Sequence, residues 1–270
     1  MNLSGCGLGL RREFIFELES YRDKNIDFFE ITPENWINMP DKFEKIFKNI
    51  IDSNKIISHG LSLSIGSFEK LDKKFLKELK TFLDRYNLEI YSEHLSFSSL
   101  NDSQTYELLP LPMSKNSANF IADKLKRAKD LLKRDIILEN ATYYFTPDSD
   151  LKEIDFINLV LEKSDSKLLL DVNNVYVNSK NHNFNPKKFI KNIDSSNVAY
   201  IHVAGHLRYD DVIIDTHGES VKKDVWKLLD YTYSKMGLKP TLLERDNNIP
   251  DLKELLKEIS IMRKIYDKYR

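Results

Sequence analysis

Short apolar segments alternate with longer amphipathic segments along almost the whole chain. The longer segments repeat apolar residues at helical spacing, as in Ile121, Leu125 and Leu132. The short segments lack the regular polar alternation of a half-exposed strand and are too short to be buried helices. They lie at Cys6–Leu10, Asp27–Ile31, Lys55–Ser58, Leu88–Tyr91, Ile136–Leu138, Leu168–Leu170, Val198–Ile201 and Thr241–Leu243. Continuous apolar strands between helices are typical of a parallel sheet that helices cover.

Eight such strands, each followed by a helix, predict one α/β domain over residues 1–270, a (β/α)8 TIM barrel. The alternative is a doubly wound open sheet, which usually carries a GxGxxG turn after its first strand. Here Gly5, Gly7 and Gly9 do not form that motif, and Arg11 and Arg12 follow them. The pattern therefore favours the barrel.

Composition excludes several classes of protein. The chain has 41 Lys and Arg against 42 Asp and Glu, a net charge of −1, so no charge excess points to nucleic acid or an anionic membrane. The 41% of hydrophobic residues is enough for a buried core, and one cysteine excludes an internal disulfide framework and a cysteine zinc cluster. Neither a membrane-spanning run nor an apolar signal core is found. We expect a cytoplasmic protein with no nucleic-acid or membrane partner.

Most of the side chains that could bind a metal stand at or just after the end of a predicted strand. All but one of the six histidines follow this rule. Because the carboxyl ends of barrel strands form one rim, these side chains are expected to share a cavity, which is where barrel enzymes act. The positions are His59, Glu93 and His94, Glu139 and Asn140, Asp171 to Asn174, His202 and His206, Asp215 and His217, and Glu244 to Asp246.

So many imidazole and carboxylate groups would be costly to bury together without multivalent cations. One ion takes roughly four to six protein ligands, so the number of candidates predicts two or three ions that share bridging carboxylates. The candidate groups mix imidazole with oxygen, include no thiolate, and offer a neutral amide at Asn174. Iron or manganese fits this mixture at least as well as zinc. The alternative is a solvated rim with ordinary salt bridges.

Several motifs follow one another in a recognisable order. They are GLGLR, DFFEITPENW, HG.SLS.GS, SEHLSFS, LLPLP, LEN, LLDVNNVYVN with NHNF.P, IHVAGH, DTHG and LLERDN.IP. Together, from about Gly5 to Pro250, they resemble the multinuclear non-haem iron-dependent oxidative enzymes, a family long known only as an uncharacterised bacterial domain. The resemblance implies a barrel similar to xylose isomerase and endonuclease IV that holds two or three irons. Members of that family use dioxygen to remodel residues, most often cysteine, in ribosomally made precursor peptides, as in methanobactin maturation, and many act with a second protein that presents the peptide.

Carried over to this sequence, the resemblance implies a set of metal ligands on seven segments. The set is His59, His94, Glu139, Asp171, Asn174, His202, Asp215, His217 and Glu244. Endonuclease IV has a histidine three residues after the aspartate that matches Asp171, whereas this chain has Asn174, which favours the iron family over a zinc nuclease. Arg245 stands where the family has an aromatic residue, and this departure bears on substrate contacts rather than on metal binding.

Five further residues are candidates for other roles. His182, in a loop beyond the DVNN segment, is a candidate acid or base, with a loop hydrogen bond as the alternative. His206 suits a role beside the ligands or in catalysis. Glu30 and Asn35 end the second strand and could hydrogen-bond the ligands or a peptide, with helix capping as the alternative for Asn35. Arg208 could bind a backbone or carboxylate group of a peptide.

The leading hypothesis is an iron- and dioxygen-dependent enzyme that oxidises a ribosomal precursor peptide, with cysteine as the expected target, during natural-product maturation. One alternative is a divalent-metal phosphodiesterase or sugar isomerase, with zinc or manganese, on the same barrel. The near-neutral net charge of the chain argues against the extended DNA contact that a phosphodiesterase acting on DNA would make. Another alternative is a carrier without catalysis that binds peptide or metal at the same rim.

Overall fold

Eight parallel strands close into a barrel in the computed structural model, which describes residues 3–21, 25–100 and 103–270. The strands follow one another around the barrel in the order β1, β2, β3, β4, β7, β8, β9 and β12, and β12 pairs with β1. Their bounds are β1 Cys6–Gly9, β2 Phe28–Ile31, β3 Ile56–Gly60, β4 Tyr91–His94, β7 Ile137–Glu139, β8 Leu168–Asp171, β9 Val198–Val203 and β12 Thr241–Leu243. The predicted TIM barrel is confirmed.

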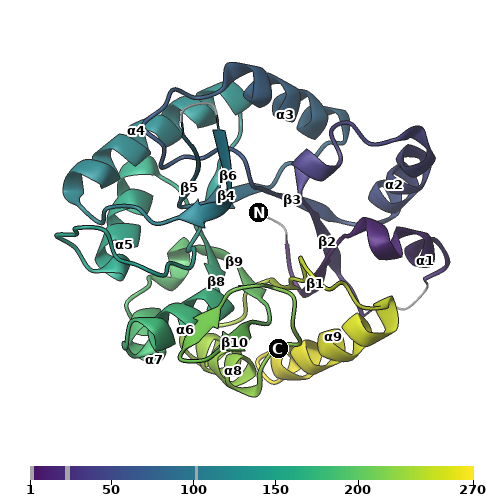
Figure 1. Cartoon of the computed structure of the whole chain (residues 1–270). Coiled ribbons are helices and arrows are strands. Elements are labelled where there is room, and N and C mark those ends of the chain that lie inside the picture. Colours follow the sequence, from purple (N-terminus) through teal and green to yellow (C-terminus); the bar gives the residue numbers. More distant parts are fainter. Residues whose placement is uncertain (1–2, 22–24, 101–102) are drawn as a thin grey trace.

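Helices surround the barrel on its outside (Figure 1). They are α1 Ile15–Ser20, α2 Asp41–Ser53, α3 Lys73–Arg85, α4 Lys115–Leu132, α5 Glu153–Ser164, α6 Val172–Asn181, α7 Pro186–Lys191, α8 Lys223–Met236 and α9 Leu252–Asp267, with short 3-10 turns at Arg12–Phe14, Pro33–Asn35 and Ser195–Asn197. The apolar stripe expected on residues 121–132 is the buried face of α4. Among the described residues, no helix combines the length and apolar character needed to cross a membrane.

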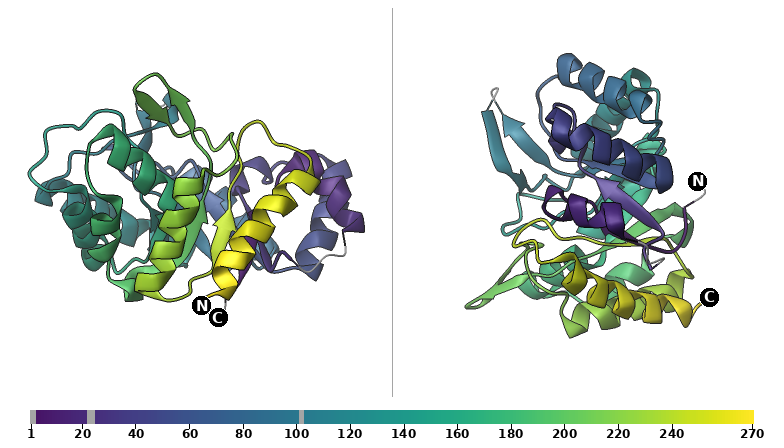
Figure 2. Two further views of the ribbon diagram at one scale, coloured as in Figure 1. Left: turned by 90° about the horizontal axis from the view of Figure 1, so that it is seen from below. Right: turned by 90° about the vertical axis from the view of Figure 1, so that its right-hand side faces the viewer.

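Two antiparallel hairpins, not expected from the sequence, interrupt the alternation of strands and helices. The first joins β5 Phe97–Leu100 to β6 Ser103–Leu109, and the second joins β10 Leu207–Tyr209 to β11 Val212–Ile214. Both project from the same end of the barrel (Figure 2). They are insertions after β4 and β9, at the carboxyl ends of barrel strands, so they stand over the rim where the site was expected.

One strand begins later than expected. Of the predicted strand Leu88–Tyr91, only Tyr91 belongs to β4. The backbone N–H of Leu88 donates to Leu83 O at the end of α3 and is therefore part of the helix end. β4 pairs with β3 from Tyr91 onward, which brings Glu93 into register with Gly60. Glu93 and His94 are therefore part of the strand and not of the loop after it.

Side chains that point into the barrel form two layers. Residues two apart on a strand share a face, and on six strands an apolar side chain is followed two positions later by a polar one. The lower members lie in one buried cluster of Leu3, Phe28, Ile57, Ile137, Leu169, Tyr200 and Leu242. The upper members are Glu30, His59, Glu139, Asp171, His202 and Glu244, all buried. Each of these strands therefore supplies both a piece of the core floor and a polar group above it.

Candidate metal centre

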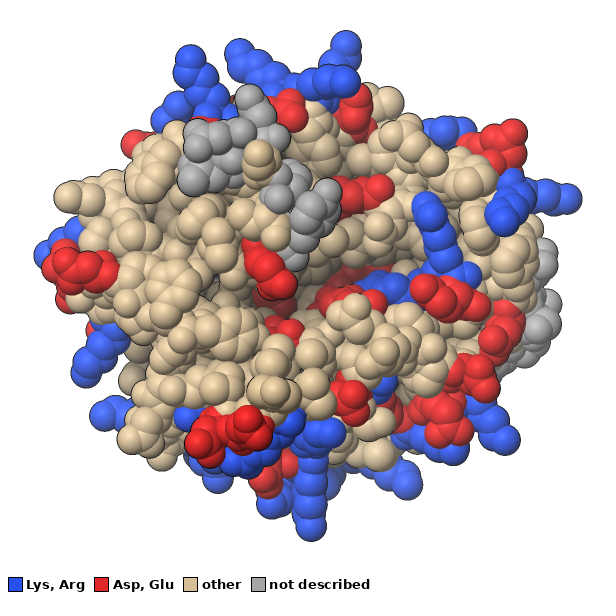
Figure 3. Space-filling model, in the orientation of Figure 1, with Lys and Arg blue, Asp and Glu red and all other residues tan. Residues whose placement is uncertain are grey.

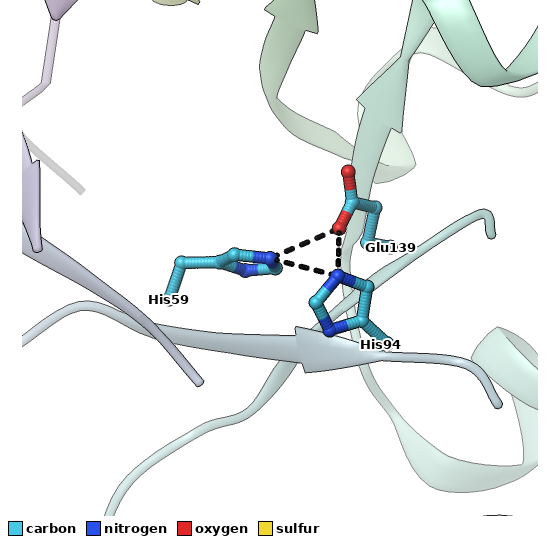
Figure 4. A group of neighbouring side chains, drawn as sticks. All are labelled: His59, His94 and Glu139. Carbon is cyan, nitrogen blue, oxygen red and sulfur yellow. Dashed lines mark hydrogen bonds and ion pairs between the residues drawn. The ribbon is translucent and has the colours of Figure 1, made fainter. Parts of the chain in front are cut away.

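His59, His94 and Glu139 come together at the carboxyl ends of β3, β4 and β7 (Figure 4). The two Nε2 atoms lie 3.2 Å apart, and Oε2 of Glu139 lies 3.0 Å from His59 Nε2 and 3.1 Å from His94 Nε2. Ligands about 2.1 Å from one ion and at right angles to each other are separated by about 3 Å, so this triangle has the dimensions of one face of a metal coordination shell.

A second group shares Glu139 with the first. Oε1 of Glu139 lies 3.4 Å from His202 Nδ1, and Oε2 of Glu244 lies 2.9 Å from the same nitrogen. Asp171, at the end of β8, completes a group in which all four ligand atoms lie within 4.8 Å of one another. Glu139 therefore contributes one oxygen to each of the two groups.

A third group forms around His217, in the loop after β11. Its Nε2 lies 2.8 Å from Asp215 Oδ1 and 4.0 Å from Asp171 Oδ2. Its Nδ1 lies 3.2 Å from Glu244 Oε2 and 3.0 Å from Oδ2 of Asp246, a residue at a strand end that the expected ligand set did not include. Asp171 and Glu244 thus connect this group to the second one.

The buried atoms that lack hydrogen-bond geometry belong largely to this cluster. Among the described residues they include both oxygens of Glu139, both ring nitrogens of His202, Asp171 Oδ2, Asn174 Oδ1, His217 Nε2 and Glu244 Oε2. These nitrogens and oxygens approach one another closely but do not point along hydrogen bonds. Because a buried polar group without a partner is costly, the donor set fits one or more metal ions.

In two of the histidines, the ring nitrogen that points away from the ligand group lies close to an oxygen. His94 Nδ1 lies 3.1 Å from Gly60 O, and His202 Nε2 lies 2.9 Å from Glu30 Oε1. A histidine whose outer N–H is held by an oxygen keeps its inner nitrogen free as a ligand, the usual arrangement around metals in proteins. Glu30 therefore contacts a ligand-set histidine, one of the two roles that its sequence position suggested.

The charges of the cluster depend on one another in the metal-free protein. Burial alone would lower the pKa of His94, but Glu139 and Glu93 outweigh burial and raise that pKa to about 9. Burial would raise the pKa of Glu139, whereas His59 and His94 hold it below its usual range. Burial raises the pKa of Asp171 well above its usual range. The metal-free cluster therefore retains protons that a metal ion must displace.

A cavity of about 870 Å³ opens above this cluster. His94, Asn174, Asp215, His217 and Glu244 reach its wall, and acidic side chains gather in the central hollow of the surface (Figure 3). Other parts of its wall come from the segment after β1, from the 3-10 turn after β2 and from β6, with Arg11, Arg12, Asn35, Trp36, Glu107 and Leu108. The unexpected first hairpin is thus part of the cavity wall.

The remaining candidate residues differ in their relation to the cavity. His206 is buried outside its wall, 2.7 Å from Asn173 Oδ1, while the amide nitrogen of Asn173 donates to Asp215. His182 lies in another pocket, where Nε2 is 2.7 Å from Tyr143 O and the ring stacks on that tyrosine. Arg208 is exposed on β10, outside the cavity wall. The structure does not bring His182 or Arg208 to the metal-ligand cluster.

The expectation that Arg245 bears on substrate contacts is corrected. Arg245 is buried, donates to Glu258 Oε2 at 2.8 Å and to Gly218 O at 3.2 Å, and does not line the cavity. Its charge is paired with helix α9 behind the loop that carries His217. Arg11 takes the place nearer the cavity, where its guanidinium pairs with Asp246. Neither pairing follows from the spacing of these residues along the chain.

Comparisons with known proteins identify a sequence family and relatives that match nearly the whole chain. The sequence model of the RiPP precursor modification enzymes MbnB/TglH/ChrH, where RiPP denotes a ribosomally synthesised and post-translationally modified peptide, matches residues 5–267. A UPF0276 protein of Shewanella loihica is 46% identical over 96% of this chain and 94% of its own length. A UPF0276 protein of Nitrosospira multiformis is 46% identical over 95% of this chain and 91% of its own length.

Two solved structures show the same fold at low sequence identity. Endonuclease IV from Thermus thermophilus superposes with a TM-score of 0.65 at 11% identity and covers 98% of this chain and 99% of its own. A xylose isomerase domain protein from Planctomyces limnophilus superposes with a TM-score of 0.61 at 13% identity and covers 99% of this chain and 98% of its own. The expected likeness to these two kinds of barrel is confirmed.

Proposed function

This chain belongs to the family of RiPP precursor modification enzymes MbnB/TglH/ChrH, and from that membership we propose that it oxidises a ribosomal precursor peptide at a centre of two or three irons. Dioxygen is the co-substrate, and a cysteine of the peptide is the residue modified. A second protein presents the peptide to the cavity. The family supports the peptide as the substrate class, and the ligand cluster supports the metal.

The observation that carries the proposal is the convergence of three groups of histidine and carboxylate ligands, several of whose buried nitrogen and oxygen atoms have no hydrogen-bond partner among the described residues. The donor set contains imidazole, carboxylate and one amide oxygen, and no sulfur of this chain takes part, since Cys6 is buried in β1. Mixed nitrogen and oxygen ligands in this number suit iron at a coordination number above four. They also leave a thiolate to be supplied by the substrate.

Each group of ligands has a distinct position in this proposal. His59 and His94 would hold one ion, His202 and Glu244 a second, with Glu139 between them. His217, Asp215 and Asp171 would hold a third, and Asn174, whose buried Oδ1 has no hydrogen-bond partner, would be a further ligand. When bound, iron supplies a Lewis acid that lowers the pKa of a coordinated thiol and a redox partner for dioxygen.

The cavity has the dimensions and lining for a segment of peptide. Its volume of about 870 Å³ is near the upper end of the roughly 300–1,000 Å³ of ligand sites, enough for a side chain with some flanking backbone. One wall carries Trp36 with the Arg12 guanidinium 5.4 Å from its ring, and the same guanidinium donates to the backbone oxygen of Asn35. On the opposite side, the hydroxyl of Tyr144 accepts a hydrogen bond from the backbone N–H of Asp215. These groups can orient a peptide over the ligand cluster.

Metal analysis and mass spectrometry together test the proposal. The protein is purified without oxygen, its iron, manganese and zinc are quantified, and it is loaded with Fe(II). The loaded protein is then mixed without oxygen with each small cysteine-bearing peptide encoded next to its gene, and the mass of every peptide is measured before and after exposure to air. We expect at least two irons per chain and an oxygen-dependent mass change in one peptide. Stoichiometric zinc with activity on abasic DNA, or epimerisation of a sugar, would contradict the proposal.

A further inference from the structure

Tyr200 lies directly beneath the ligand cluster, in contact with residues that support two of its histidines. It comes two residues before His202 on β9, so both side chains face the barrel interior. The Tyr200 hydroxyl donates to Glu30 Oε2 at 2.7 Å and lies 2.6 Å from Ser92 Oγ. Tyr200 and Ser92 are both 0% exposed. Buried hydroxyls at these distances make strong and well-defined hydrogen bonds.

The polar contacts have one consistent direction. Because Tyr200 donates to Glu30, its oxygen is left to accept from Ser92. Ser92 Oγ is then left to accept from the Nδ1–H of His59, 2.8 Å away. At the other end, Oε1 of Glu30 lies 2.9 Å from Nε2 of His202, an ion-pair contact without hydrogen-bond geometry, and the negative charge of the carboxylate favours a proton on that nitrogen. With their protons on these outer nitrogens, both histidines keep their inner nitrogens free for a metal ion.

The two histidines belong to different metal positions. His59 contributes Nε2 to the group with His94, whereas His202 contributes Nδ1 to the group with Glu244. An outer partner usually orients a single ligand. Here one hydroxyl lies between the outer partners of two ligands, so its hydrogen bonds bear on both positions.

We propose that Tyr200 and Ser92 are positioning residues of the metal centre. With Glu30 they form a buried polar chain that holds His59 and His202 in their metal-binding tautomers and couples the two metal positions. The inference rests on the proposed metal centre, but its test needs neither peptide nor dioxygen. Its test uses metal affinity and the spectrum of the bound metal.

The variant Tyr200→Phe removes the hydroxyl and keeps the ring. It leaves Glu30 Oε2 without its donor and Ser92 Oγ with only the more distant Ser58 O, 3.3 Å away, as an acceptor, so the outer partners of both histidines lose their alignment. Anaerobic titrations with Fe(II) and with Co(II) measure the two affinities, and the Co(II) absorption bands report the ligand field. We expect both affinities to fall about 10- to 100-fold, with altered Co(II) bands.

Single-position backgrounds separate the two effects. In His94→Ala the group with Glu244 keeps all of its ligands, and in Glu244→Ala the group with His94 keeps all of its own. Adding Tyr200→Phe weakens the remaining position in either background. Ser92→Ala acts mainly on the position of His59, and Ser92→Thr, which keeps a hydroxyl, restores most of that affinity.

Tyr233→Phe is the matched control. Tyr233 is also buried, and its hydroxyl donates to Thr241 Oγ at 2.6 Å on the outer side of the barrel, between α8 and β12. We expect it to lower the thermal stability of the metal-free protein as much as Tyr200→Phe does, with unchanged metal affinities. Equal affinities in Tyr200→Phe and the parent, or a change at only one position, would overturn the coupling. A parent protein that binds neither Fe(II) nor Co(II) at these ligands would overturn the metal centre itself.

Discussion

Oε1 of Glu139 lies 3.4 Å from Nδ1 of His202, while Oε2 of the same carboxylate lies 3.0 Å from Nε2 of His59. One carboxylate thus belongs to two ligand groups on opposite sides of it. A carboxylate shared between neighbouring ions is a common feature of centres with two metals, which lie about 3.5–4 Å apart. The geometry of Glu139 therefore leads to the first prediction.

Glu139→Gln should weaken both metal positions, because the amide has the shape of the carboxylate but only one oxygen and no charge. His94→Ala should affect mainly the position that it shares with His59. Iron per chain, measured after anaerobic Fe(II) loading and gel filtration, compares the two. We expect the loss of nearly all iron in Glu139→Gln and of about one ion in His94→Ala. Equal iron in the two variants would argue against a bridging role for Glu139.

Asp171→Ala and His202→Ala should each lower bound iron and abolish peptide modification while the barrel stays folded. Both side chains are 0% exposed in the polar upper layer, so truncation removes a ligand and little of the apolar core. Circular dichroism, iron content and mass spectrometry of the peptide are the measurements. Full iron content with normal turnover in either variant would refute its assignment as a ligand.

The control for both variants is Leu169→Ala, two residues before Asp171 on β8 and in the apolar layer below. Removal of a fully buried leucine should cost about 2–5 kcal/mol of unfolding free energy through the cavity that it leaves. Urea unfolding measures this loss. Iron affinity should change only indirectly, because no ligand is removed.

Asn174→His should retain metal and lose oxygen-dependent peptide modification. The amide nitrogen of Asn174 donates to Asn140 O at 3.0 Å, and its Oδ1 is buried without a hydrogen-bond partner. An amide oxygen is a weak ligand that leaves an ion able to accept a substrate, whereas imidazole binds more strongly and competes with a thiolate. Anaerobic iron loading followed by mass spectrometry of the peptide after exposure to air shows whether the variant binds iron and whether it still modifies the peptide. Turnover as fast as that of the parent would show that the amide has no mechanistic role.

Iron affinity should rise with pH up to about pH 9. The pKa of His94 is raised to about 9 in the metal-free protein, so below that pH a metal ion must displace its proton. Each displaced proton adds about a tenfold gain in apparent affinity per pH unit, and the contribution of His94 to this gain ends once His94 is deprotonated without metal. His206, whose pKa burial lowers to about 4, adds nothing to this slope. Competition with a chelator between about pH 6 and 9 measures the dependence of iron affinity on pH, and an affinity that does not change with pH would contradict the prediction.

The sequence predicted the barrel because each strand of the barrel can be recognised from an apolar run of its own. An apolar run such as Leu168–Leu170 is a strand in any parallel sheet, and the amphipathic stretch after it can only cover the outside. The hairpins were not predicted because β6 reads SQTYELL, without a continuous apolar run, and because the side chains of Leu207, Tyr209 and Val212 in the second hairpin are exposed. Exposure removes the apolar pattern on which such predictions depend.

The sequence by itself determined which chemical groups stand at the carboxyl ends of the strands, since the two-residue repeat of a strand places His59 above Ile57 and Glu139 above Ile137. Only the tertiary structure decided which groups meet. Closure of the barrel sets the register between strands that are far apart in the chain, and that register brings Tyr200 to Ser92 and Glu139 to His202. Arg11 likewise reaches Asp246 only because β1 pairs with β12. Pairings of this kind depend on the geometry of the closed sheet, which no local pattern encodes.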